Sequence, residues 1–364
     1  MFSFEPTEEQ RMLVDAINRY AINDLRAKSH EADEENQFSK SLIEKGWELG
    51  FLQASIPDAY GGFGERSAVT GALAAEAMAW GDLAGALAVM APGLFALPIL
   101  LGGSEEQKKE YLPPVIGGEW CPYTAALIEP FYDFDPNEPR CNAVEENGSY
   151  MLNGVKACVP FAPDAPAMLV YARLGEATQG FILPAGTPGL AIGEREKLLG
   201  VRALPTYKLI MEGVRLPRAN RLGGPEGHDY APILAASRIA LAAMAVGLAR
   251  AALEYACAYA KDREVFGVKV AQKQAIAFMI AEMATEIEAI RLLTWEAAWM
   301  LDNGKAEAVR HSYLAHSGAL DMAMMVTDRA VQILGGHGYI REHPVELWMR
   351  NGRGIATLTG LAIV

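Results

Sequence analysis

The sequence has little cysteine and no excess of basic charge. Its cysteines, Cys121, Cys141, Cys158 and Cys257, are well separated and form no Cys-x-x-Cys pair. This usage excludes a disulfide scaffold and is typical of a reducing compartment. The 364 residues carry 32 Lys and Arg against 45 Asp and Glu, a net charge of −13. Because phosphate backbones and anionic lipids repel so acidic a chain, we expect neither nucleic acid nor a membrane surface as a partner.

The sequence also lacks a secretory signal and a clean membrane span. Its first residues show no basic start followed by an apolar core, so we expect a cytoplasmic protein. The uncharged stretch 83–101 is nearly long enough to span a bilayer. Pro92 and Pro98 would break a single helix there. We therefore predict two buried helices joined by a turn.

Several common catalytic and nucleotide-binding motifs are missing as well. There is no Gly-x-x-x-x-Gly-Lys-[Ser/Thr] phosphate loop and no Gly-x-Ser-x-Gly nucleophile turn. His311 and His316 do not share a helical face, so we predict no metal site. With 51% hydrophobic residues, the chain can nevertheless bury a large core.

Hydrophobic spacing divides the chain into a helical, a β and a second helical region. Between the two helical regions, residues 122–226 contain short runs in which apolar and polar residues alternate. Turn residues separate these runs, and this pattern predicts strands. Asn147-Gly148 and Asn153-Gly154 flank one of these runs as turn signals, the strongest hairpin pattern in the chain. We predict an α+β, multi-domain protein with domains at 1–121, 122–226 and 227–364.

Two capping boxes predict where helices of the first region begin. Thr7 is followed by Gln10, and Ser104 by Gln107, at the spacing that lets each pair satisfy the backbone N–H groups of a helix start. We expect the helix that begins after Ser104 to stop at Pro113-Pro114, because proline lacks the N–H that continues a helix.

A small group of residues in the C-terminal region has two interpretations. Glycine at a helix end is commonly a cap, and an arginine there is commonly a surface charge. However, the same residues are also typical of a pyrophosphate site. The guanidinium of an arginine offers several N–H donors to the phosphates, and glycine lets the backbone come close to them. The group consists of Arg263, Phe266, Gln274, Gln332, Gly335 and Gly336.

Together with other segments in the same order, this group resembles the acyl-CoA dehydrogenase family over essentially the whole chain. The resemblance implies an N-terminal helical domain, a β-barrel-like middle domain and a C-terminal four-helix bundle. It also implies FAD bound between subunits, an acyl-CoA substrate oxidised across its α and β carbons, and an electron-transferring flavoprotein as electron acceptor. The matching segments are Ile56–Gly64, Gly103–Pro113, Asn153–Lys156, Arg263–Gly267 with Gln274, and Gln332–Tyr339.

The resemblance also assigns roles to single residues. Arg238 would contact the substrate, and six residues would hold the ADP half of a neighbouring subunit's FAD. These six are Arg263, Phe266, Gln274, Gln332, Gly335 and Gly336.

The catalytic base of the family is missing from both positions where it occurs. The reaction needs a carboxylate that removes the α-proton while the flavin accepts a hydride from the β-carbon. Thr359 stands at the usual place of the glutamate, and Ser237 stands at the alternative place. Because such hydroxyl groups cannot act as that base at neutral pH, we predict no catalytic residue in this chain.

In the family, certain segments hold a subunit's own flavin ring. The corresponding segments of this sequence also differ from the family's pattern. Phe131, Tyr132 and Phe134 replace small residues, and the family's Trp-Ile-Thr is Cys158-Val159-Pro160 here. The change removes an aromatic wall and a hydroxyl group, and proline offers no N–H.

We therefore predict a non-catalytic subunit of a heteromeric acyl-CoA dehydrogenase, such as a heterotetramer, whose paralogous partner supplies the base. Three alternatives stay open. They are a homomeric dehydrogenase with an unrecognised base, a flavin monooxygenase on the same fold, and a flavin-free scaffold that is structural or binds acyl-CoA.

Overall fold

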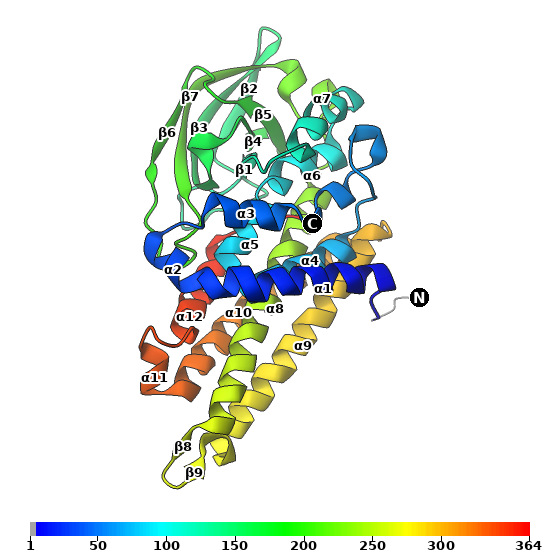
Figure 1. Ribbon diagram of the computed structural model, residues 1–364. Coiled ribbons are helices and arrows are strands. Elements are labelled where there is room, and N and C mark those ends of the chain that lie inside the picture. Colours follow the sequence, from blue (N-terminus) through cyan, green and yellow to red (C-terminus); the bar gives the residue numbers. More distant parts are fainter. Residues whose placement is uncertain (1–4) are drawn as a thin grey trace.

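The computed structural model describes residues 5–364 and contains the three regions expected from the sequence (Figure 1). The N-terminal helices lie in the middle of the molecule, the β region covers one side of them, and a long helical bundle extends from the other side. Residues 1–4, which belong to the segment searched for a signal sequence, lie outside this description.

The N-terminal domain consists of α-helices, and a longer segment with two 3-10 helical turns joins Trp47 to Ala68. A π-helical segment, Ala21–Arg26, joins the first two helices. The helices are α1 (Glu8–Tyr20), α2 (Ala27–Glu35), α3 (Lys40–Trp47), α4 (Ala68–Gly81), α5 (Leu83–Met90), α6 (Gly93–Gly102) and α7 (Glu105–Ile116).

Most of the local predictions for this domain are confirmed. Both capping boxes form, at Thr7 and at Ser104. The apolar stretch is two buried helices, α5 and α6, which meet at an angle of 51°. The predicted stop at Pro113-Pro114 is wrong, because α7 continues to Ile116. The last turn survives since Pro113 still accepts a hydrogen bond from the Gly117 N–H at 3.0 Å, and Ile116 is buried against the core.

The middle domain is a curved sheet with the strand order β1-β4-β2-β3-β7-β6, in which β5 pairs with β4 (Figure 1). The Asn147-Gly148 hairpin is confirmed: both residues have positive φ, 49° and 78°, and they join β2 to β3. The second turn signal is wrong, because Asn153-Gly154 lies inside β3 at a bulge against β7. The strands are β1 (Thr124–Ala126), β2 (Asn142–Glu146), β3 (Ser149–Pro160), β4 (Ala167–Leu174), β5 (Ala177–Pro184), β6 (Leu190–Arg195) and β7 (Thr206–Pro217).

The C-terminal domain consists of three long α-helices and two short ones, counted over the described residues. By length and hydropathy α8 could cross a membrane, but 83% of its most apolar window is buried inside the structure, so it is the core helix of the bundle. The elements are α8 (Ala231–Asp262), the hairpin β8 (Glu264–Val265) and β9 (Val268–Lys269), α9 (Gln274–Asp302), α10 (Ala308–Leu334), α11 (Gly336–Tyr339) and α12 (Val345–Gly354).

One buried carboxylate joins the three domains. Asp33 on α2 has a side chain only 3% exposed and forms ion pairs with Arg350 of α12 at 2.9 Å and with Arg341 at 2.9 Å. Arg202 of the middle domain lies 3.5 Å from the same carboxylate. Although burial opposes it, hydrogen bonds to Asp33 and Glu346 raise the pKa of Arg350. This cluster therefore joins the three domains, in addition to the apolar core that they share.

Replacing this carboxylate tests the cluster directly. Asp33→Asn leaves three guanidinium groups without their shared counter-charge, so we expect the free energy of unfolding to fall by about 3 kcal/mol. Urea denaturation measures the change. The control is Glu31→Gln, which breaks an exposed pair with Lys28 and should leave the denaturation midpoint nearly unchanged, because solvent screens such pairs. Equal denaturation midpoints for both variants would show that Asp33 does not hold the domains.

Candidate functional site

The six residues predicted to hold a neighbour's FAD lie at the end of the bundle that points away from the middle domain (Figure 1). They occupy the junctions of α8, the β8–β9 hairpin, α9, α10 and α11. Arg263 caps α8, Phe266 forms the hairpin turn, Gln274 opens α9, Gln332 lies in the last turn of α10, and Gly335 and Gly336 join α10 to α11.

The polar members of this group are free to bind something outside the chain. Arg263, Gln274 and Gln332 are all exposed. Their side chains form no ion pair or hydrogen bond with any residue in 5–364. A free guanidinium and two free amides at one end of the bundle can therefore meet an anionic ligand without breaking an internal contact.

Phe266 stands in a conformation that the fold alone does not favour. Its backbone has a φ of 55°, its ring is 92% exposed, and Gly267 follows with a φ of 77°. Asparagine is the usual residue in the first position of such a turn, because an aromatic residue is strained there. Strained, exposed positions of this kind are concentrated at binding sites.

The two glycines differ in what the fold requires of them. Gly335 has φ 59° and ψ −128°, a backbone conformation that is accessible almost only to glycine. A Cβ atom at Gly336 would meet nothing within 4 Å, and its φ is not positive. The fold thus needs Gly335, whereas the missing side chain of Gly336 leaves room for close approach by a ligand.

The two positions of the family's base lie together, far from this group. Ser237 of α8 and Gly360, the neighbour of Thr359, line the same cavity. At a rise of about 1.5 Å per residue, α8 separates Ser237 from Arg263 by about 40 Å. The base positions and the six exposed residues of one chain therefore cannot serve one and the same site.

The cavity between the base positions contains no group that can accept a proton at neutral pH. Its volume is about 20 Å³, and its lining residues include no carboxylate and no histidine. Burial raises the pKa of Tyr171 and of Tyr230, so both phenols stay protonated. The Ser237 hydroxyl is buried without a hydrogen-bond partner in the described structure.

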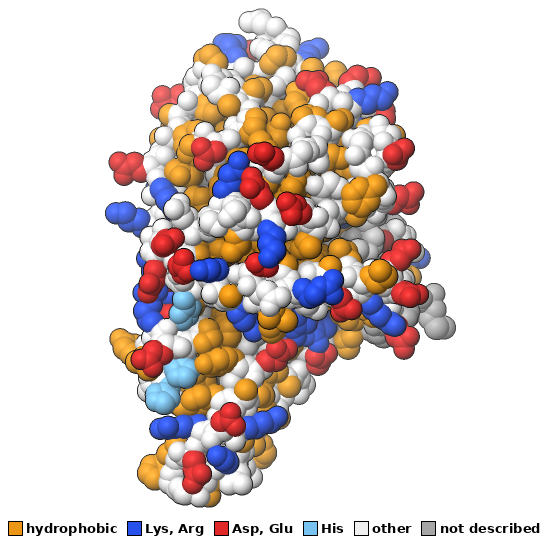
Figure 2. All heavy atoms as spheres, viewed as in Figure 1, with side chains coloured by type: hydrophobic (Ala, Val, Ile, Leu, Met, Phe, Trp, Pro, Cys, Tyr) orange, Lys and Arg blue, Asp and Glu red, His pale blue; other side chains and the backbone are white. Residues whose placement is uncertain are grey.

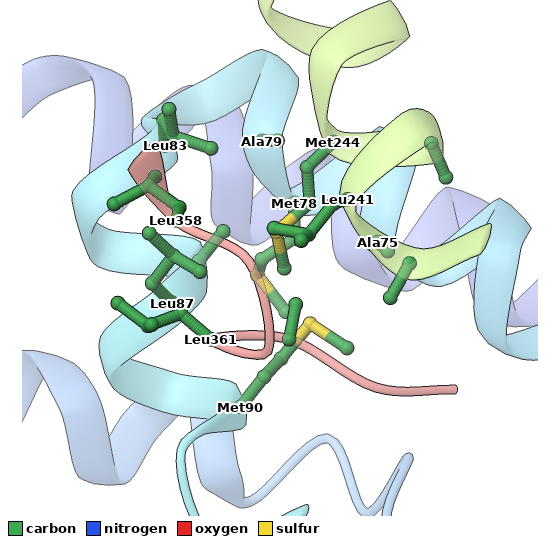
Figure 3. Close-up of a cluster of buried hydrophobic side chains, with 14 of the residues drawn as sticks. Ala75, Met78, Ala79, Leu83, Leu87, Met90, Leu241, Met244, Leu358 and Leu361 are labelled. Atoms are coloured by element: carbon green, nitrogen blue, oxygen red, sulfur yellow. The ribbon is translucent and has the colours of Figure 1, made fainter. Parts of the chain in front are cut away.

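The chain's own residues fill the space around this cavity. After α12 the segment Leu358–Val364 runs without helix or strand between the N-terminal helices and α8, and all but Thr359 and Gly360 are buried. Figure 3 shows Leu358 and Leu361 among the apolar side chains of α4, α5 and α8. The Nε of Arg66 donates to the Val364 carbonyl oxygen at 3.1 Å. A space of about 20 Å³ has room for one water molecule but not for an acyl chain.

The predicted substrate residue Arg238 follows Ser237 but does not line the cavity. Its guanidinium carbon lies 5.2 Å from the centre of the Tyr313 ring. Burial lowers the pKa of Arg238, and burial together with Arg238 lowers the pKa of His316 to about 4. His316 is therefore neutral at pH 7.

The segments that would hold this chain's own flavin ring offer few free donors. The Cys158 N–H donates to Glu196 at 2.8 Å, and Pro160 has no N–H. Phe131 stacks against the Arg140 guanidinium at 4.3 Å, and Tyr132 points fully into solvent. Phe134 packs against the main core. The residues present thus fit the diphosphate half of FAD better than its ring.

The sequence analysis missed a buried ion pair that joins two of the segments beside the expected flavin ring. The Lys156 Nζ lies 2.9 Å from Glu129, and both side chains are at most 1% exposed. Glu129 also accepts from the Arg140 and Cys141 N–H groups at 2.7 and 2.8 Å. Lys156 stands in a segment that carries the family resemblance and Glu129 does not, and their separation along the chain hides the contact.

No metal site is found in the part of the chain that the structure describes. Within residues 5–364, no group of three or more His, Cys, Asp or Glu side chains is placed to hold an ion.

The two glycines give a matched stability test. Gly335→Ala forces alanine into a left-handed conformation and should lower the free energy of unfolding by about 1–3 kcal/mol. Gly336→Ala meets open space and should leave it within about 0.5 kcal/mol. Urea denaturation of both variants measures the difference. A loss of stability in Gly336→Ala as large as that in Gly335→Ala would mean that the fold, and not a ligand, requires both glycines.

Comparisons with known proteins match this architecture domain by domain. Models of the N-terminal, middle and C-terminal domains of acyl-CoA dehydrogenases match residues 7–119, 125–214 and 231–362. The chain is 35% identical to cyclohex-1-ene-1-carbonyl-CoA dehydrogenase of Geobacter metallireducens, over 97% of this chain and 95% of that protein.

Solved structures agree with the sequence matches. Butyryl-CoA dehydrogenase from Megasphaera elsdenii superposes with a TM-score of 0.88 at 31% identity, covering 100% of this chain and 96% of that chain. A glutaryl-CoA dehydrogenase from Mycobacterium smegmatis in complex with FADH2 superposes with a TM-score of 0.85 at 25% identity, covering 98% and 92%. From its sequence, its fold and these matches, the chain belongs to the acyl-CoA dehydrogenase family, a family of FAD-dependent oxidoreductases.

Proposed function

We propose that this chain is the non-catalytic subunit of a heteromeric acyl-CoA dehydrogenase. The observation that carries the proposal is the cavity between Ser237 and Gly360, which has a volume of only about 20 Å³, no carboxylate or histidine among its lining residues, and Gly360, Ala362 and Ile363 along its wall. A subunit that removes an α-proton needs a base there and room for the acyl group. This chain offers neither.

The second part of the proposal is that the chain lends its exposed residues to the FAD of its partner. When bound, FAD supplies the hydride acceptor of the reaction. Arg263 pairs with the diphosphate, Gly336 lets the backbone approach it, and Phe266 packs against the cofactor. Gln274, Gln332 and Gly335 complete the cradle.

The partner that fits this role is a paralogous acyl-CoA dehydrogenase subunit, which supplies the base and the contacts to the flavin ring. The assembly is then a cytoplasmic heterotetramer that oxidises an acyl-CoA and passes electrons to an electron-transferring flavoprotein. In this proposal the half-buried Arg238, which forms no ion pair within 4 Å in the described residues, faces the substrate side. Relatives named for acyl-CoA substrates support the substrate class.

A homomeric dehydrogenase is the second candidate, and one observation favours it. The chain aligns over nearly its full length with relatives named as dehydrogenases in their own right. That reading requires a base at a position other than Thr359 and Ser237. It predicts that acyl-CoA alone bleaches flavin bound to this chain in the absence of any other subunit.

Replacing Arg263 tests the proposal that this chain contributes to the FAD site of its partner. Arg263→Ala should strip FAD from the co-purified complex, because the diphosphate loses its guanidinium partner, while this subunit stays folded. The ratio of flavin to protein absorbance measures occupancy. Arg310→Ala, another exposed arginine on the bundle, should keep full flavin. Full occupancy in Arg263→Ala would refute the lending role.

The residue at the family's base position gives a second test. Thr359→Ala should leave the dehydrogenase activity of the assembled complex nearly unchanged, because this hydroxyl moves no proton. Steady-state kinetics with an acyl-CoA substrate of the complex measures the effect. A loss of about a hundredfold or more, the scale of removing an acid–base group, would contradict the proposal.

A further inference from the structure

Two tyrosines on successive turns of α8 hold the loop that follows α10. The Tyr259 hydroxyl lies 2.9 Å from Nδ1 of His337, and the Tyr255 hydroxyl lies 2.7 Å from Nδ1 of His343. These contacts tie α8 to α11 and to the segment before α12. Neither tyrosine belongs to the six residues assigned to FAD.

The histidines form an ordered aromatic cluster with these tyrosines. Their rings stack with centroids 5.3 Å apart and planes 13° from parallel, and the Tyr259 ring packs edge-on against both at 5.8 Å. Tyr255 packs edge-on against the buried Trp348 of α12. Figure 2 shows histidine side chains at the surface on the side of the bundle where Figure 1 places α11 and α12. The cluster therefore has a rigid inner side and an outer side open to solvent.

Tyr259 is placed between the two parts of the proposed diphosphate cradle. Residues four apart share a helix face, so Tyr259 and Arg263 lie on the same side of α8. The Tyr259 hydroxyl is also 3.5 Å from the carbonyl oxygen of Leu334, the residue before Gly335. The bond to His337 then fixes the chain directly after Gly336. Tyr259 thus contacts the corner on both sides of its two glycines.

Backbone hydrogen bonds join the corner to its own chain neighbours. The Gly335 N–H donates to the carbonyl oxygens of Val331 and Gln332 at 3.1 Å, and the Gly338 N–H donates to that of Gly335 at 2.9 Å. Gly335 and Gly336 are exposed, and a Cβ at either position would meet nothing within 4 Å. Among the side-chain hydrogen bonds of the described residues, those of Tyr259 connect the corner to α8.

We propose that Tyr259 and His337 are a positioning pair for the cofactor diphosphate. The pair sets the Gly335–Gly336 corner at a fixed place relative to Arg263, so that backbone and guanidinium face one diphosphate together. Tyr255 and His343 anchor the far side of the same loop and have no such role. This inference rests on the proposed lending of FAD contacts.

The test compares two equal changes one helical turn apart. Tyr259→Phe and Tyr255→Phe each remove one hydroxyl and keep the ring, so both should lower the melting temperature by a similar, small amount. We expect Tyr259→Phe to weaken FAD binding roughly five- to tenfold, the range that one hydrogen bond supplies. Tyr255→Phe should stay within about twofold, which is under 0.5 kcal/mol. Titration of FAD into the apo form of the co-purified complex, followed by flavin fluorescence, measures both.

A rescue variant separates positioning from packing. His337→Asn keeps a hydrogen-bond acceptor near the place of Nδ1 and should bind FAD within about threefold of wild type, whereas His337→Ala should match Tyr259→Phe. Equal FAD affinity for the Asn and Ala variants, or for the two tyrosine variants, would overturn the inference. If Arg263→Ala loses FAD but Tyr259→Phe retains it, only the positioning role fails. If Arg263→Ala also retains FAD, the lending role fails with it.

Discussion

The buried Asp33 carboxylate contacts all three domains through its ion pairs and adds to the apolar core that they share. Its partners, Arg202, Arg341 and Arg350, come from the middle and C-terminal domains, so one charge on α2 fixes both against the N-terminal helices. Next to it, the Asn351 side chain accepts from the Val201 N–H at 2.7 Å and holds a loop of the middle domain. The segment Leu358–Val364 follows directly after α12 and enters the core between domains that this cluster keeps together. A change in the cluster would therefore reach the cavity beside Ser237.

The long helix α8 gives the chain two separate functional ends. At the end near Ser237, a cavity of about 20 Å³ lined mostly by apolar residues has no room for an acyl chain and contains no carboxylate or histidine. At the other end, Arg263, Gln274 and Gln332 are exposed, and their side chains form no ion pair or hydrogen bond within the described residues. A helix of this length separates the ends by about 40 Å, so a complete site needs a second chain to supply what the first lacks. The loss of one end and the retention of the other are what a division of labour between subunits would produce.

Sequence alone predicted much of the fold because its signals are local. Capping boxes, the Asn147-Gly148 turn and the long helical repeats act over a few residues. The errors arose where packing overrides local preference: Pro113-Pro114 stays inside α7, and Gly154 marks a bulge where a Cβ would lie 2.7 Å from the Cα of Cys141. The candidate site residues were assigned through family resemblance, not through spacing, and they stay predictions. Contacts between distant positions, such as Lys156 with Glu129 and Tyr259 with His337, carry no local signal and required the structure.

The central claim is that this chain completes a partner's FAD site and does not form a working site of its own. The most direct measurement is the visible absorption spectrum of the protein purified alone and after co-expression with the paralogous subunit, before and after addition of acyl-CoA. The account predicts little flavin in the chain alone, and in the complex a flavin band that acyl-CoA bleaches. A full flavin band in the chain alone that acyl-CoA bleaches without any partner would contradict it.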